Sequence, residues 1–238
     1  NRNKETYFLL QLQLANAYTL RGDISLAIDR ARLMYEEAKE TGYDFGMVVA
    51  NQAIGDAYTI ASQYDKASEA YQNALKELSL ISPQHPYRTQ LLLKASNTLQ
   101  RKGRLEKARR VLNDIDKALL QQPDYATGFF AAIEKANYAI SHGHLSKTYL
   151  KEAAKYLQDM DSIYRLYPEK FYYFHLKYTA AAYYRAMGNW DKAYWDKALK
   201  LYEELRQEYS VNKRSAYYRW ITQETIYLYK IQGEAMDA

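Results

Sequence analysis

Cysteine is absent from this sequence of 238 residues, and only four prolines and nine glycines occur in it. The absence of cysteine excludes disulfide bonds, thiolate metal ligands and a cysteine nucleophile. Unbroken apolar runs are no longer than a few residues, far short of the roughly 20 that cross a bilayer, so we expect no membrane insertion by this part of the chain. Because proline and glycine interrupt helices, their scarcity favours long helices.

Apolar residues make up 48% of the chain and charged residues 26%, the balance of an ordinary globular protein. Apolar side chains recur every three or four positions, as at Ile54, Ala57 and Ala61. This period predicts helices throughout, and no strand-like alternation of any length competes with it.

A pattern of small, aromatic and turn residues recurs along the chain. In its clearest copy, Gly55 is followed by Tyr58, a turn at Ser62, and then Ala67 and Tyr71. Such internal repetition is typical of solenoids, in which each copy is one supersecondary unit. The turn position recurs every 40 to 45 residues, at Gly22, Ser62, Gly103, Gly143, Gly188 and Gly233.

Each copy is predicted to be a pair of helices with the turn residue between them. A turn glycine would supply the left-handed backbone conformation that other residues adopt only at a cost. Proline falls between one pair and the next, at Pro83, Pro86, Pro123 and Pro168, where it ends or starts helices harmlessly. We therefore expect one domain, 1–238, with helix pairs at 8–43, 48–83, 89–123, 129–168 and 174–209 and a final helix over 212–233.

At these positions the chain resembles the tetratricopeptide repeat family, whose pattern combines a small residue, an aromatic residue, a turn glycine and further alanine and aromatic positions. The second copy matches almost throughout, whereas the fourth has Thr148 at the alanine position and the fifth has Lys197 at the aromatic position. The family's usual period is about 34 residues, so the longer spacing is similar to the long-helix arrays of kinesin light chains and bacterial peptide-sensing regulators. The resemblance implies an all-α, right-handed superhelical solenoid of five antiparallel helix pairs and a C-terminal capping helix.

One position of every predicted first helix carries a small residue. We expect it to lie where the two helices of a pair approach most closely, beside a large residue one turn later. A bulky residue at Gly55 would overpack this contact at a cost of about 1 to 3 kcal/mol. The small residues are Ala15, Gly55, Ser96, Ala136 and Ala181.

The next position of the first four copies carries Asn16, Asp56, Asn97 and Asn137. The resemblance implies that this position faces the concave groove, which the first helices line. An asparagine both donates and accepts hydrogen bonds, so it can pair with the backbone of an extended peptide. Lys94 and Arg101, on the first helix of the third pair, are expected to reach the same groove. The alternative is that these side chains bond neighbouring helices and hold the array together.

Positive charge is concentrated in the third pair. Residues 84–122 carry a net charge of +6, whereas the whole chain carries only +5. Such a patch would steer an acidic peptide or partner surface toward it. The alternative is an ordinary solvated face. Because the array lacks any recognised motif for binding DNA or RNA, we expect no nucleic-acid partner.

The chain contains 26 tyrosines, and many of them lie in its C-terminal half together with all three tryptophans. The spacing of three, four and seven residues places many of these rings on helix stripes, which favours packing between helices. Tyrosine and tryptophan also anchor interfaces, so an exposed subset would mark a docking surface.

No catalytic, cofactor-binding or metal-binding pattern is recognisable, so we expect a non-enzymatic protein without cofactor or metal. No histidine pair has the metalloprotease spacing, and neither a glycine-rich phosphate loop nor a nucleophile elbow occurs. His142 and His144 flank the turn at Gly143, where we expect no physiological metal site.

Three functions are compatible with these observations. The first is a module that binds a protein or peptide segment in the concave groove. The second is the input domain of a bacterial signalling protein, such as a histidine kinase or transcriptional regulator, whose output domain lies in the same polypeptide. The third is a structural scaffold without a groove ligand. The compartment stays open between the cytoplasm and an extracytoplasmic, periplasmic region.

Overall fold

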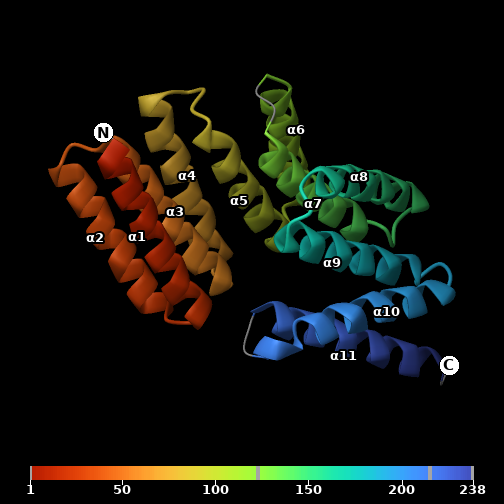
Figure 1. Ribbon diagram of the computed structural model, residues 1–238. Helices are drawn as coiled ribbons and strands as arrows, with labels where there is room; N and C mark the ends of the chain where they lie inside the picture. The colour runs from red at the N-terminus through yellow and green to blue at the C-terminus, as the bar shows by residue number, and fades with distance from the viewer. Residues whose placement is uncertain (1, 122–123, 214–215, 237–238) are drawn as a thin grey trace. The chain divides into compact units, whose positions relative to one another are not determined.

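The structure is a computed structural model that describes residues 2–121, 124–213 and 216–236. Within these ranges every regular element is a helix, and within each part of the chain described below consecutive helices fold back on one another (Figure 1). The predicted all-α fold of five helix pairs and a final helix is confirmed. The α-helices are α1 (Arg2–Arg21), α2 (Ile24–Glu40), α3 (Asp44–Ile60), α4 (Tyr64–Ile81), α5 (Tyr87–Arg101), α6 (Leu105–Gln121), α7 (Tyr125–Ser141), α8 (Lys147–Leu166), α9 (Lys170–Met187), α10 (Ala193–Glu208) and α11 (Ala216–Met236), with a short 3-10 helix at Ser210–Asn212.

The chain divides into two compact units, residues 1–122 and 123–238. In the first unit, α2 packs against α1 and α3, and α4 packs against α3 and α5. The first helices of successive pairs also touch, α1 with α3 and α3 with α5. The second unit follows the same rule, since α8 packs against α7 and α9, and α10 packs against α9 and α11. Packing between neighbours alone is the property that defines a solenoid.

The core of the first unit joins one stripe from each of its first five helices. Burying such apolar stripes against one another is the main source of helix stability in a protein of this kind. Fully or almost fully buried members are Phe8 and Leu12 on α1, Met34 on α2, Val48 on α3, Leu78 on α4 and Leu91 on α5.

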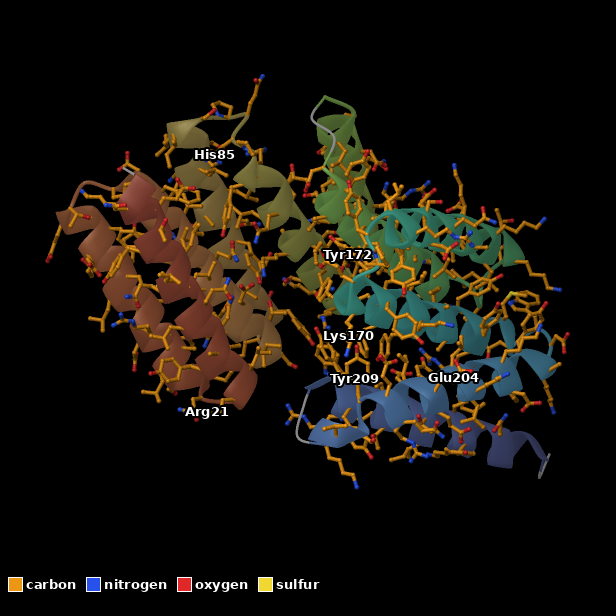
Figure 2. All side chains as sticks on the ribbon, in the orientation of Figure 1. Arg21, His85, Lys170, Tyr172, Glu204 and Tyr209 are labelled. Atoms are coloured by element: carbon orange, nitrogen blue, oxygen red, sulfur yellow. The ribbon has the colours of Figure 1, made fainter. Side chains whose placement is uncertain are left out.

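Aromatic rings dominate the core of the second unit, where Figure 2 labels Tyr172 and Tyr209. Phe174 on α9 is 1% exposed, and its ring centroid lies 4.2 Å from that of Tyr217 on α11 and 5.1 Å from that of Tyr209. The ring of Tyr172 lies 4.5 Å from that of Phe129 on α7. Packing between helices is therefore confirmed for these tyrosines. Other rings of this half are instead more than a third exposed: Tyr125, Phe130, Tyr167, Phe171, Trp190, Trp220, Tyr227 and Tyr229.

The turns within the pairs are of two kinds. Gly22 and Gly103 adopt positive φ values of 95° and 74°, as predicted, and Ser62 adopts φ 58° in the equivalent place. The prediction of a left-handed conformation at Gly143 and Gly188 is wrong, since neither residue has a positive φ. These two glycines are buried, and close packing explains them: an added Cβ would lie 2.5 Å from Leu150 Cδ2 at Gly143, and 1.8 Å from a Trp195 ring carbon at Gly188.

The different turns of the second unit explain its departures from the repeat pattern. They span residues 142–146 and 188–192 and are longer than those of the first unit, such as 22–23. The longer turn shifts the buried face of the second helix along the sequence. Thr148 and Lys197 are therefore exposed, whereas Trp195, Ala198 and Tyr202 are buried.

Several helices extend beyond the expected bounds. α7 and α9 begin at Tyr125 and Lys170, about one turn before the expected starts at 129 and 174. α11 continues through Gly233, so the turn predicted there is wrong. The predicted end of the third pair at Pro123, and residues 214–215 of the predicted final helix, lie outside the described residues. The division into repeats stays a prediction.

Candidate peptide-binding face

A half-buried side chain follows the buried small residue on each of the first four first helices. Ala15, Ser96 and Ala136 are 0% exposed, and Gly55 is buried. The helical turn rotates the following residue partly out of the contact, so it lies between the buried interior and the surface. In the first unit we call these following residues the first-helix row: Asn16 on α1, Asp56 on α3 and Asn97 on α5, all half-buried. Asn137 occupies the same position on α7 in the second unit and is also half-buried.

Asp56 is held by side chains from the next helices of the first unit. The ammonium group of Lys94 on α5 lies 2.9 Å from Asp56 Oδ1 and 3.0 Å from Oδ2. The hydroxyl of Tyr71 on α4 donates to Oδ1 at 2.6 Å. The side chains of Asp56 and Lys94 are 12% and 31% exposed, so this is a largely buried ion pair. It joins the second helix pair to the third.

The network continues along α3 and α5. Gln52 Nε2 approaches Asp56 Oδ2 at 3.4 Å, and the hydroxyl of Tyr87 donates to Gln52 Oε1 at 2.6 Å. Burial and the charge of Asp56 raise the pKa of Tyr71 well above its ordinary value, and the same two causes raise that of Tyr87. Both phenols therefore stay protonated as donors at any physiological pH.

The remaining predicted residues differ in how their polar groups are used. Arg101 Nε donates to Asn97 Oδ1 at 2.9 Å, and the Arg101 side chain is exposed. Asn16 and Asn137 form no hydrogen bond through their side chains within the described ranges. The structure thus brings Asp56, Lys94 and the Asn97–Arg101 pair onto neighbouring helices of one unit. It places Asn16 on α1, which contacts α3.

Gln52 and Tyr87 belong to this face but were not predicted. Gln52 lies one turn before Asp56 on the same helix, a spacing that offered a usable signal. Tyr87 reaches Gln52 across 35 positions of sequence. No local pattern contains that contact, because it depends on how the second and third pairs stack.

Part of the positive charge of the third pair is neutralised by contacts with carboxylates. Lys102 of the α5–α6 turn pairs with Asp65 on α4, and Lys117 pairs with Asp114 one turn away at 3.3 Å. Further exposed cations on or beside α6 include Arg104, Lys107 and Arg110.

The histidines of the fourth turn make structural contacts. His142 is 9% exposed, and its Nδ1 lies 2.8 Å from the carbonyl oxygen of Tyr138. His144 Nδ1 lies 2.9 Å from the carbonyl oxygen of Ser141. Among the described residues no group of three or more histidine, aspartate or glutamate side chains is arranged to hold a metal ion. Within the same ranges no helix is long and apolar enough to cross a membrane.

No protein-family model matches the sequence, and no curated protein matches it. Solved structures do match. A crystal structure of the nearly identical TPR-like repeats of a Podosopora anserina protein assigned as a kinesin light chain has a TM-score of 0.60 at 16% identity, covering 88% of this chain and 97% of its own. A second structure of such repeats has a TM-score of 0.56 at 15% identity, covering 92% and 96%. Such low identity shows the fold alone. The chain therefore has the fold of tetratricopeptide-like repeats.

Proposed function

We propose that this chain is a non-enzymatic interaction module whose first unit binds an extended peptide segment along α1, α3 and α5. The observation that carries the proposal is the first-helix row, in which successive first helices each place one half-buried polar group after a buried small residue. A peptide in an extended conformation exposes unpaired N–H and C=O groups along its length, and such groups need partners when a surface covers them.

The members of the row would contribute differently. Asn16 forms no side-chain hydrogen bond with the residues that the structure describes, and it can both donate and accept. Asn97 and Arg101 already bond to each other, which holds the guanidinium group beside the carboxamide. Asp56 and Lys94 neutralise each other, and they support the face by fixing α3 against α5.

Arg101 gives the face a preference for an acidic ligand. Its side chain is exposed and forms no ion pair with a carboxylate within the described residues. A guanidinium group can form two parallel hydrogen bonds to one carboxylate. A peptide carboxylate beside Asn97 would therefore be favoured over a neutral or basic side chain.

The test begins with selection of ligands from a phage-displayed library of random 12-residue peptides on the immobilised chain. Fluorescence anisotropy then gives the Kd of each selected peptide for the parent chain and for an Asn16→Ala, Asn97→Ala double variant. Two lost hydrogen bonds, each worth about 0.5 to 1.5 kcal/mol, should weaken binding by about five- to a hundredfold.

The matched control is Asn73→Ala, because Asn73 is an exposed asparagine on the second helix α4 of the same unit. The control should bind as the parent does, and all three proteins should keep the same helical circular dichroism. Equal affinity of the double variant and the control would contradict the proposal. Asn137 on α7 can be tested in the same way for ligands that contact the second unit.

A further inference from the structure

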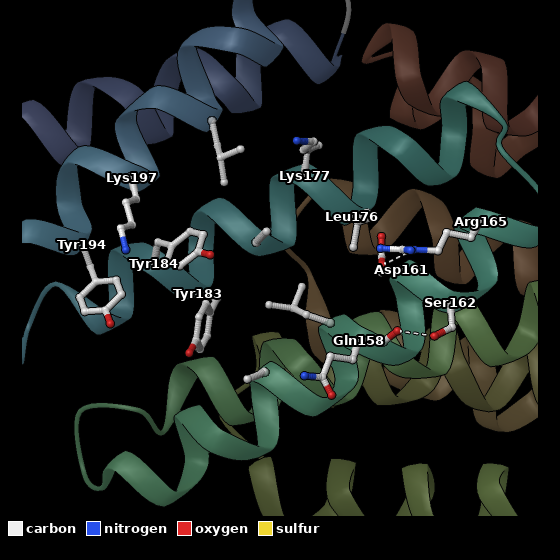
Figure 3. A pocket seen from close by; sticks show the side chains of 14 residues that line it. Gln158, Asp161, Ser162, Arg165, Leu176, Lys177, Tyr183, Tyr184, Tyr194 and Lys197 are labelled. Carbon is white, nitrogen blue, oxygen red and sulfur yellow. Dashed lines mark hydrogen bonds and ion pairs between the residues drawn. The ribbon is translucent and has the colours of Figure 1, made fainter.

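A cleft of about 890 Å³ lies in the second unit between α8, α9 and α10 (Figure 3). It lies outside the first unit, so an inference from it does not depend on the first-helix row. Apolar side chains from all three helices contribute to its lining, and two of them are small. They are Ala154 and Leu157 on α8, Leu176 and Ala180 on α9, and Leu201 on α10.

Cations line the same cleft, one from each helix, and Figure 3 shows them well separated from one another. Arg165 on α8 pairs with Asp161 at 2.7 Å, so its charge is neutralised within the cleft. Lys177 on α9 and Lys197 on α10 form no ion pair within the described residues. Asp161 is the only carboxylate among the lining residues described. The cleft therefore has an excess of positive charge.

Aromatic rings hold both unpaired ammonium groups. Lys197 Nζ lies 4.6 Å from the ring centroid of Tyr194 and 5.9 Å from that of Tyr184. The two rings stack at 6.0 Å with an interplanar angle of 15°. Lys177 Nζ lies 5.8 Å from the ring centroid of Tyr173. A cation over a ring keeps its charge and its donors, so each ammonium group is positioned yet still able to bind an anion.

We propose that this cleft binds an acidic peptide segment that also carries an apolar side chain. Charge complementarity identifies the occupant: two ammonium groups without a carboxylate partner attract carboxylates. An apolar side chain of the peptide would cover the leucines and alanines of the lining, and removing this apolar surface from water favours binding. Tyr183, which also lines the cleft, combines a large apolar surface with a polar hydroxyl, as interface anchors do.

The arrangement favours a peptide over a compact anion. The cations come from different helices, and apolar surface lies among them, so a single phosphate would contact little of the lining. A chain with acidic residues on either side of an apolar one would meet Lys177, Lys197 and the apolar lining together.

The probe for the test is the phage-displayed random 12-residue library, selected here on a chain that carries Asn16→Ala and Asn97→Ala. This background weakens the binding expected at the first-helix row, and the cleft variants below identify peptides that bind in the second unit whether or not that proposal holds. Enriched peptides should contain aspartate or glutamate beside leucine, isoleucine or phenylalanine. Their affinity should fall as sodium chloride is raised from about 50 to 300 mM, because salt screens the contact.

Two variants test the site itself. Lys177→Gln with Lys197→Gln should weaken binding by about three- to tenfold by removing both charges. Ala180→Leu should weaken it independently, because the larger side chain fills part of the cleft. The control is Lys200→Gln, which removes an exposed charge of α10 outside the lining and should bind as the parent does. Circular dichroism and thermal melting check that each variant is folded.

Three results would overturn the inference. One is enrichment of peptides without an excess of acidic residues. Another is binding that neither the lysine pair nor Ala180→Leu weakens relative to Lys200→Gln. The third is equal competition by a mixed-sequence single-stranded DNA oligonucleotide, which would show a general polyanion surface instead of a peptide site.

Discussion

At the scale of single residues, glycine serves two purposes in this chain. Gly22 and Gly103 allow the backbone to reverse through positive φ. Gly55 instead allows close contact, because an added Cβ would lie 2.6 Å from Cε1 of Tyr71. Gly188 does the same for Trp195, whose indole nitrogen donates to the carbonyl oxygen of Arg185 at 3.2 Å. Each contact glycine therefore fixes where one large ring packs.

Gly188→Ala should lower the free energy of unfolding by about 1 to 3 kcal/mol, the usual cost of overpacking. The added methyl group would lie 1.8 Å from Cδ1 of Trp195, which is only 7% exposed and has little room to move. Urea denaturation measures the change. Gly233→Ala is the control: it adds the same group inside α11 with nothing within 4 Å, and should stabilise the helix by about 0.5 to 1 kcal/mol. Equal effects of the two substitutions would contradict this assignment.

His175 should make stability depend on pH. Burial lowers its pKa to about 4, and the rings of Phe171 and Phe174 lie 4.5 and 5.2 Å away. Between the ordinary pKa of about 6.5 and the lowered one, the unfolded chain binds the proton and the folded chain does not. The free energy of unfolding should therefore fall as pH drops from about 6.5 to 4, by up to about 3 kcal/mol from this residue.

The measurement is urea denaturation across that pH range for the parent and for His175→Phe. Carboxylates change stability in both proteins, so the histidine contribution is the difference between their slopes. The variant should lose less stability on acidification than the parent does. Parallel pH profiles would show that His175 does not remain neutral in the folded state.

At the scale of helices, the Asp56–Lys94 pair links α3 to α5. Replacing one partner leaves the other charge largely buried without a counter-charge, which costs more than the pair itself contributes. Asp56→Ala alone should lower the free energy of unfolding by about 2 to 4 kcal/mol, since it also leaves the Tyr71 hydroxyl without its acceptor.

A double-mutant cycle with Asp56→Ala and Lys94→Met measures the coupling. Because Lys94 is 31% exposed, solvent screens part of the attraction, and a coupling of about 1 to 2 kcal/mol is expected. The exposed pair of Lys117 and Asp114 provides the comparison and should couple by less than about 0.5 kcal/mol. Coupling of equal size in both pairs would show that burial does not strengthen the Asp56 contact.

Helices and the turns of the first unit were predictable because their signals are local. A period of three to four residues, a turn glycine and the prolines between pairs all lie within a few residues of the feature they specify. The turn type at Gly143 and Gly188 was not predictable in this way, since it depends on the side chains of Leu150 and Trp195 packing back onto the glycines.

In the candidate sites, too, contacts between different helices could not be predicted from local sequence. The row positions of Asn16, Asp56 and Asn97 follow from the repeat register, but the partners of Asp56 do not. Tyr71 and Lys94 meet it only once α3, α4 and α5 have stacked. The cleft of the second unit is likewise absent from any single stretch of sequence, because three helices contribute to it.

At the scale of the whole molecule, the fold is shared with structures of TPR-like repeats that have 15 and 16% identity to this chain. A solenoid tolerates such divergence because each pair specifies only a few small and large contact positions, while its exposed faces vary freely. A shared fold of this kind does not carry a function with it, so the proposed sites are tested on this chain's own residues.

Each unit contains its own buried core, so a fragment of residues 1–122 should fold alone. We expect a helical far-ultraviolet circular dichroism spectrum and a cooperative urea transition, because contacts in a solenoid are between neighbours. Gly55→Leu in the fragment should lower the transition midpoint by overpacking Tyr71. A fragment without a cooperative transition would show that the first unit needs the second to fold.

Peptide binding along α1, α3 and α5 is the central claim, and side-chain amide NMR tests it most directly. The parent chain, with its asparagine side chains assigned, is titrated with a peptide selected from the library. The side-chain NH₂ resonances of Asn16 and Asn97 should shift progressively with the bound fraction, and that of Asn73 on α4 should stay in place. Saturable binding that leaves Asn16 and Asn97 unshifted would contradict the account.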